Sequence, residues 1–168
     1  MKILKSNART IIMALFLGSV LLVSCGAPTC EKAMPNNMSL ESTSDQKVAM
    51  DGYDVTAFFN QSKAVKGSAD FQSSYRGVTY HFSNGNTKQM FDANPNKFLP
   101  EFGGFCAVAA SFGKVEPAQI DLFDLYEGKL YFARNAKAQK MWMEDKKTIR
   151  DRAAGLWPCL VIDNGRTL

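Results

Sequence analysis

In this chain of 168 residues, the cysteines and the single histidine are the side chains best suited to nucleophilic, acid–base or metal chemistry. Among them, Cys106 has neighbours typical of a functional site. It follows Gly103-Gly104-Phe105 and begins a run of small apolar residues that predicts a buried helix over 105–112. A thiol in the first turn of a helix lies near unpaired backbone N–H groups, which favour the reactive thiolate. The glycines let a ligand approach the backbone closely. Cys106 is therefore the candidate catalytic residue, and Gly103, Gly104 and Phe105 are candidate binding residues. The alternative is an inert thiol in an apolar core.

The first 24 residues have the pattern of an export signal. A basic start precedes an apolar run over residues 11–23, which is shorter than the roughly 20 residues that span a bilayer. The run ends at Leu22-Val23-Ser24-Cys25, which resembles the bacterial lipoprotein box, where the cysteine is acylated, for example with palmitate, and becomes the mature amino terminus. An uncleaved anchor or an ordinary cleavage site is the alternative. We expect a protein anchored to the cell envelope through Cys25. Gly26, in place of an inner-membrane retention aspartate, favours the periplasmic face of the outer membrane.

Loss of the signal changes the charge balance. The whole chain has 20 Lys and Arg against 16 Asp and Glu, a net charge of +4, but three of the basic residues lie in the signal. The mature chain of 144 residues would carry +1. This near-neutral balance, without a basic cluster, argues against nucleic acid as a partner. The expected partners are the membrane, through the lipid anchor, and a small ligand or an envelope protein.

Two further cysteines predict a disulfide. With Cys25 acylated, three thiols remain in an oxidising compartment, so one disulfide leaves one thiol over. Residues 25–47 are polar and rich in Gly, Pro, Ser and Asn, which predicts a flexible tether that contains Cys30. Cys159 begins the C-terminal tail, residues 159–168. Both segments could move to meet, so we expect a Cys30–Cys159 disulfide and a free Cys106.

His81 is the only histidine and lies in a predicted strand between Tyr80 and Phe82. The sequence offers no Cys-x-x-Cys, no histidine pair and no carboxylate cluster at ligand spacing, so no residue is assigned to a metal. We expect a surface or half-buried strand histidine. If the strand packed against the Cys106 helix, His81 could instead orient or deprotonate the thiol.

The elements that would position these residues alternate between strands and helices. Turn residues Arg76-Gly77 and Glu127-Gly128 predict two hairpins, 71–75 with 78–82 and 122–126 with 129–133. Helices are predicted over 83–93 and from Asn135 to Ala154, the second ended by Gly155 and Pro158. The inner face of that last helix is predicted from four apolar residues: Ala138, Trp142, Ile149 and Ala153. The prediction is a single compact α+β domain over 48–158, with small antiparallel hairpins packed against helices and no internal repeat.

Several stretches of this domain, in order, resemble the exported YHS-domain proteins of bacteria. They are Gly52-Tyr53-Asp54-Val55-Thr56-Ala57-Phe58-Phe59, residues 65–71, Tyr75-Arg76-Gly77-Val78-Thr79-Tyr80-His81-Phe82-Ser83, residues 91–98 and 100–107, 128–132 and Leu156-Trp157-Pro158. The resemblance implies a YHS-like domain and adds Tyr53 and His81 to the candidate binding residues. Some YHS domains of metal-handling proteins carry cysteines at the strand-to-helix turn, where this chain has Phe82-Ser83-Asn84-Gly85-Asn86-Thr87 and none. In the exported branch the Gly-Gly-aromatic-Cys-Ala position recurs, and some relatives place selenocysteine in such proteins. A correspondence at Cys106 would imply a redox or metal–thiolate role.

These observations leave three hypotheses of function. The first is a lipid-anchored module that binds a small ligand or a metal ion near Cys106, with an aromatic-lined pocket. The second is a thiol-dependent redox enzyme with Cys106 as nucleophile. The third is an envelope protein-interaction module. The sequence names neither a cofactor nor a substrate.

Overall fold

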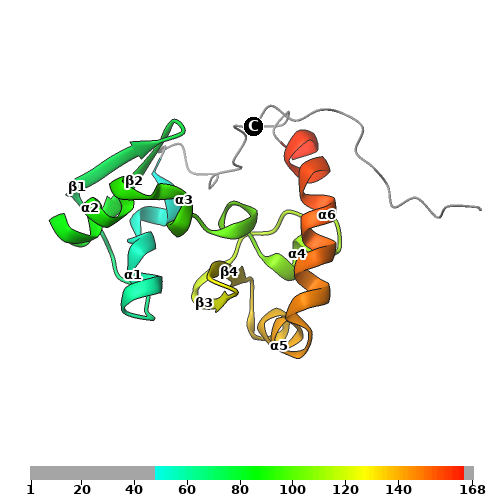
Figure 1. Ribbon diagram of the computed structural model, residues 1–168. Coiled ribbons are helices and arrows are strands. Elements are labelled where there is room, and N and C mark those ends of the chain that lie inside the picture. The colour runs from blue at the N-terminus through cyan, green and yellow to red at the C-terminus, as the bar shows by residue number, and fades with distance from the viewer. Residues whose placement is uncertain (1–47, 165–168) are drawn as a thin grey trace, which may run out of the picture.

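Two hairpins, each preceded by a short turn and followed by helices, form the part of the chain that the structure describes. This computed structural model describes residues 48–164 (Figure 1), so the predicted signal, the tether, Cys25 and Cys30 lie outside it. The first half comprises η1 (Ala49–Gly52), α1 (Val55–Asn60), β1 (Ser68–Tyr75), β2 (Val78–Phe82), α2 (Gly85–Ala93) and α3 (Pro95–Phe98). The second half comprises η2 (Glu101–Gly104), α4 (Ala107–Ser111), β3 (Gln119–Tyr126), β4 (Lys129–Ala133), α5 (Ala136–Glu144) and α6 (Lys146–Asn164).

Both predicted hairpins are confirmed, and so is the α+β class. Strands β1 and β2 pair antiparallel, as do β3 and β4, in two separate two-stranded sheets. Each turn places two residues in the left-handed region, Arg76 and Gly77 (φ 53° and 86°) or Glu127 and Gly128 (φ 50° and 73°). This is the tight turn whose twist suits a two-residue hairpin connection.

The second half repeats the first, which overturns the expectation of no internal repeat. The pairing of β1 with β2 shifts register between Ser68 and Gln72, and the pairing of β3 with β4 shifts in the same way between Gln119 and Phe123. The bridge from Val48 to β2 recurs as a bridge from Pro100 to β4. Helices α2 and α5 have equal lengths, and an asparagine side chain caps each of them, Asn84 in the first half and Asn135 in the second.

The sequence contains a signal for this repeat. The pattern Tyr-x-Gly-x-x-Tyr-x-x-x-Asn begins at Tyr75 and occurs again at Tyr126, 51 residues along the chain. Three of the shared residues have the same structural role in both halves: the glycine of the hairpin turn, a tyrosine buried in the core and the asparagine that caps the next helix. The other positions differ because the two halves pack against different neighbours, which obscures the similarity.

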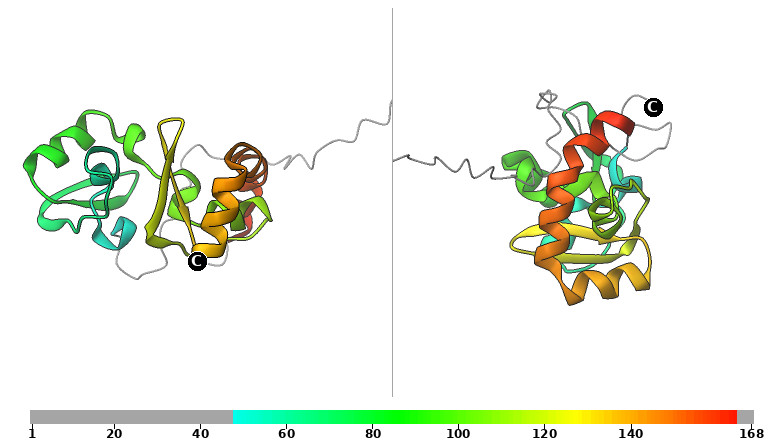
Figure 2. Two further views of the ribbon diagram at one scale, coloured as in Figure 1. Left: turned by 90° about the horizontal axis from the view of Figure 1, so that it is seen from below. Right: turned by 90° about the vertical axis from the view of Figure 1, so that its right-hand side faces the viewer.

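The two halves share a core. The ring of Phe58 in α1 contacts Phe123 and Phe132 of the second half edge to face, with centroid distances of 4.8 and 5.3 Å. Phe58, Leu130 and Phe132 form one buried cluster across the boundary. Figures 1 and 2 show the β3–β4 hairpin between the first half on one side and helices α5 and α6 on the other.

The prediction of one last helix ended by Gly155 is wrong in two respects. The chain breaks at Asp145 (φ −151°), whose carboxylate accepts the Thr148 N–H and starts α6 as a new helix. Helix α6 then continues through Gly155 and Pro158 to Asn164. A proline inside a helix costs about 3 kcal/mol. Packing offsets this cost, because Trp157, Leu160 and other side chains of α6 lie against α4, and Val161 lies against Phe105. The four predicted inner-face residues do share one cluster, but they come from two helices.

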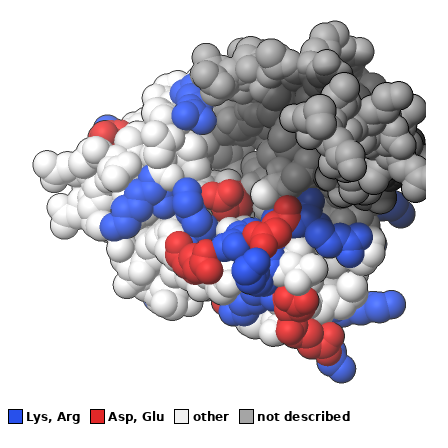
Figure 3. Space-filling view, turned by 45° about the vertical axis from the view of Figure 1, so that its right-hand side comes forward, with Lys and Arg blue, Asp and Glu red and all other residues white. Residues whose placement is uncertain are grey.

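Charges on the surface are mixed rather than segregated. Figure 3 shows basic and acidic side chains interspersed on one face of the molecule. Several of them pair, including Arg150 with Glu127 and Lys147 with Asp151. No helix within residues 48–164 is long and apolar enough to cross a membrane.

Candidate functional site

Two left-handed turns face each other at the boundary between the halves. In η1, Met50, Asp51 and Gly52 have φ of 53°, 50° and 75°. In η2, Phe102 and the two following glycines repeat this conformation. Residues with a side chain rarely adopt it, so the surrounding contacts must hold these turns in place.

The turns approach closely at Gly104. A β-carbon at this position would lie 2.8 Å from the Met50 Sδ and would have to displace it. Gly104 is also left-handed, with φ of 82°. The backbone conformation therefore favours glycine here, whereas the Met50 thioether belongs to a flexible side chain that could move aside.

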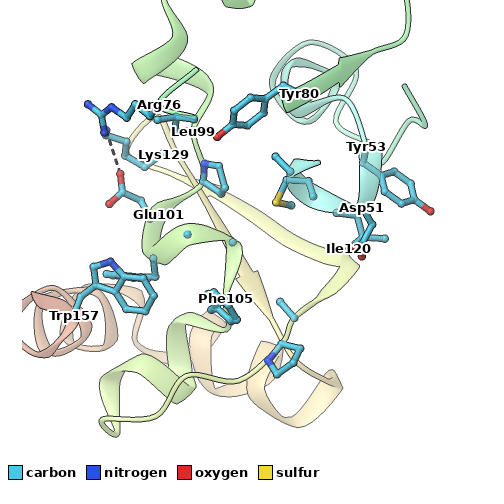
Figure 4. A pocket seen from close by; sticks show the side chains of 18 of the residues that line it. Asp51, Tyr53, Arg76, Tyr80, Leu99, Glu101, Phe105, Ile120, Lys129 and Trp157 are labelled. Carbon is cyan, nitrogen blue, oxygen red and sulfur yellow. Dashed lines mark ion pairs between the residues drawn. The ribbon is translucent and has the colours of Figure 1, made fainter. Parts of the chain in front are cut away.

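A pocket of about 880 Å³ opens around the two turns (Figure 4). Its walls come from both halves and from α6. Five aromatic side chains line it: Tyr53, Tyr80, Phe102, Phe105 and Trp157. This volume and this aromatic lining, with a few polar groups, are typical of small-molecule sites.

Four of the predicted binding residues line this pocket. They are Tyr53 from the first half and Gly103, Gly104 and Phe105 from the second. Figure 4 shows Tyr53 at the opposite side of the pocket from Trp157, with Phe105 on the floor between them. The expectation of a site around the glycine pair therefore coincides with the pocket.

Cys106 does not line the pocket. Its side chain is fully buried (0% exposed) in the cluster around α4. The thiol accepts the N–H of Ala109 at 3.4 Å and so caps α4, while the backbone N–H of Cys106 donates to Glu116 at 3.0 Å. Cys106 is a free thiol. Its contacts are those of a capping residue in the core rather than of a nucleophile open to substrate.

His81 belongs to a different environment. It is half-buried, and its Nδ1 lies 3.3 Å from the position that a Gly52 β-carbon would take. Within the described residues, no hydrogen bond joins His81 to Cys106. The described part of the chain also holds no group of three His, Cys, Asp or Glu side chains placed to bind a metal ion.

Cys159 is disulfide-bonded. Its predicted partner, Cys30, lies outside the described residues, as does Cys25. The Cys30–Cys159 pairing and the acylation of Cys25 therefore stay predictions.

Charged groups line both ends of the pocket. Figure 4 shows Arg76, Lys129 and Glu101 gathered at one end, and Asp51 near Tyr53 at the other. Lys129 pairs with Glu101 at 3.1 Å. At the far end, the Lys66 ammonium donates to the backbone carbonyl of Asp51 and lies 4.4 Å from the centroid of the Tyr53 ring.

Sequence reasoning missed most of the wall. The sequence assigned no role in a site to four of the lining residues: Met50, Arg76, Ile120 and Lys129. Trp157 appeared only in the resemblance. Met50-Asp51-Gly52 and Phe102-Gly103-Gly104 match in backbone conformation but lie 52 residues apart, one more than the 51 of the hairpin pattern, so the sequence repeat alone does not align them.

No protein-family model, curated protein or solved structure matches the chain. The site is therefore interpreted from its own geometry.

Proposed function

We propose that this chain is a lipid-anchored, YHS-like protein of the cell envelope that binds a small organic ligand between its two halves. The observation that carries the proposal is the pocket of about 880 Å³ lined by five aromatic side chains. Such a volume is in the range that accepts a drug-sized ligand. The left-handed turns that form its centre are the kind of strained backbone that clusters at binding sites.

Binding of an organic ligand fits the pocket better than the other two chemical hypotheses. A thiol-dependent enzyme needs an accessible nucleophile, whereas Cys106 is buried. A metal site needs several donor groups close together, and the described residues assemble none. Aromatic and aliphatic walls instead favour a ligand with a substantial apolar part.

The envelope location rests on the amino-terminal pattern. The signal-like residues 1–24 and Cys25 support acylation, and two or more acyl chains anchor a protein stably. Labelled palmitate should be incorporated into the full chain and not into Cys25→Ala. Equal incorporation into both would refute this part of the proposal.

Ligand binding can be tested with octan-1-ol, a neutral apolar probe, and the full chain. Because Trp157 lines the pocket, its fluorescence should change saturably on binding, and Trp157→Phe should remove most of that change. Ala154 is exposed and also lines the pocket, so Ala154→Phe should fill part of the pocket and weaken binding.

The matched control is Ala136→Phe, which places the same ring on an exposed alanine that does not line the pocket. This variant should bind octan-1-ol like the unmodified chain. Equal affinity of the two alanine variants, or a fluorescence change that never saturates, would refute binding in the pocket.

A further inference from the structure

Two acidic and two basic residues line the pocket, and among them only Lys129 and Glu101 form an ion pair. Lys129 and Glu101 neutralise each other at 3.1 Å. The Lys66 ammonium donates to the backbone carbonyl of Asp51, so one ammonium and one carboxylate lie at the far end of the pocket. Arg76 has no such counter-charge: among the described residues its guanidinium contacts only the neutral Asn96 oxygen, at 3.3 Å, and the Tyr75 ring.

The balance of charge therefore differs between the two ends of the pocket. The end near Tyr53 is locally neutral, whereas the end with Arg76 carries an unmatched cation. An arginine side chain offers a planar set of N–H donors that matches a carboxylate or a phosphate. Its one neutral partner, Asn96, leaves most of those donors available to a ligand.

The exposure of the side chains also differs between the rim and the interior of the pocket. Arg76, Asn96 and Lys129 are exposed and form a wet rim. Of the aromatic residues that line the pocket, Phe102 and Phe105 are buried, at only 6% and 8% exposed, and Trp157 is half-buried. A polar rim beside an apolar floor suits a ligand with one charged end and one apolar end.

We infer that the ligand is an amphipathic organic anion, with its carboxylate or phosphate at Arg76 and its apolar part against Phe105 and Trp157. This inference rests on the proposed binding function and adds its ligand class. Because the rim is exposed, the contribution of the charge is modest and sensitive to salt.

The test compares octanoate with octan-1-ol, which have equal chain lengths and differ in charge. At low salt the full chain should bind octanoate about three- to fivefold more tightly, the preference that an exposed ion pair supports. Sodium chloride should reduce this preference. In Arg76→Gln the preference for octanoate over octan-1-ol should disappear. Arg134→Gln is the matched control, since Arg134 is exposed, pairs with Glu116 and does not line the pocket.

A second variant should strengthen binding, so a folding defect cannot imitate its effect. Glu101→Gln removes the partner of Lys129 and frees a second cation at the same rim. Octanoate should bind this variant about two- to fivefold more tightly than it binds the unmodified chain, because one more exposed cation can pair with the anion. Octyl phosphate tests the head group: tighter binding than octanoate assigns a phosphate, and weaker binding assigns a carboxylate.

The outcomes separate the two proposals. If octan-1-ol binds and Ala154→Phe blocks it, but octanoate shows no preference or Arg76→Gln keeps it, the ligand class is wrong and the pocket stands. If neither probe binds saturably, the proposed binding function itself is wrong.

Discussion

The two halves of the molecule build the same turn-to-helix junction with different cap residues. In the first half, Asp54 caps α1, and its buried carboxylate accepts the N–H and hydroxyl of Thr56 at 3.0 and 2.7 Å. It also accepts the N–H and hydroxyl of Ser83, both at 2.8 Å. At the equivalent junction of the second half, the Cys106 thiol accepts a single N–H, from Ala109.

This difference shows how each half is held together. Asp54 joins α1 to the end of β2 by hydrogen bonds, whereas the second half carries Arg134 where the first has Ser83. The second half instead packs α4 against the long helix α6, with Ala153 and Leu160 buried in that contact. The first half has no such helix, because α3 ends just before Leu99-Pro100. The first half therefore depends on the hydrogen bonds of the buried Asp54 carboxylate, and the second half on packing between helices.

The largest effect is expected from the core that the halves share. Phe58→Ala should destabilise the chain by about 3–5 kcal/mol, since it leaves a cavity between Phe123 and Phe132. Unfolding in urea, followed by tryptophan fluorescence and by circular dichroism, should shift as one transition. Phe112→Ala, at a 55% exposed ring, is the control and should change stability by about 0.5 kcal/mol or less. Two separate transitions would show that the halves fold independently.

The next largest loss of stability is expected at Gly67, where the second half has a different residue. A β-carbon at Gly67 would lie 2.5 Å from the His81 carbonyl carbon, so Gly67→Ala should cost about 3 kcal/mol. The equivalent residue in the second half is Ala118. There the reverse change, Ala118→Gly, should cost only about 0.5–1 kcal/mol, measured by the same urea titration. A cost of Gly67→Ala below about 1 kcal/mol would contradict this close approach to the His81 backbone.

The cap residues themselves should differ in cost. Asp54→Ala should destabilise by about 2–4 kcal/mol, because it leaves the buried donors of Thr56 and the part-buried donors of Ser83 without this acceptor. Cys106→Ala should cost about 1 kcal/mol, since it removes one weak acceptor and a small volume. Thermal unfolding of the two variants compares them directly. A larger loss from Cys106→Ala would mean that the thiol does more than cap α4.

The smallest effect is a pH dependence in the second half. Burial raises the pKa of Tyr131 from 10.0 to about 12, and the nearby Glu101 carboxylate acts in the same direction. The folded state therefore holds this proton more tightly than the unfolded chain. Its contribution to stability is complete below pH 10 and is lost as the pH rises from 10 to 12.

Tyr131→Phe removes the titrating group and should flatten this alkaline loss of stability. Unfolding free energies between pH 9 and pH 12 would measure it, starting from the ordinary tyrosine pKa near 10. An unchanged alkaline slope in the variant would assign the loss to other groups.

Local patterns anticipated much of the fold. The turns Arg76-Gly77 and Glu127-Gly128 defined both hairpins, because two residues at positive φ are a short-range requirement. The Asn135 cap and the end of α2 before Pro95 also depend on near neighbours only. The glycine pair Gly103-Gly104 marked the pocket for a similar reason, since both residues adopt the positive φ that favours glycine in the turn that lines it.

Long-range packing decided the rest. Local signals predicted a helix end at Gly155, yet contacts of α6 with α4 and Phe105 carry the helix through Pro158. Met50 and Phe102 adopt left-handed conformations that residues with side chains rarely take. Contacts far along the chain accompany both: Met50 packs against the cluster of Leu130 and Phe132, and the Phe102 ring packs against Tyr131 and Trp157.

The sequence by itself determined the hairpins, the caps, the α+β class and the glycines of the pocket, all of which follow from interactions within a few residues. Only the tertiary structure decided that Cys106 is buried while Arg76 and Trp157 line the pocket. Exposure of a side chain depends on which distant segments cover it. Here those segments are supplied by the other half of a repeat and by a helix near the end of the chain.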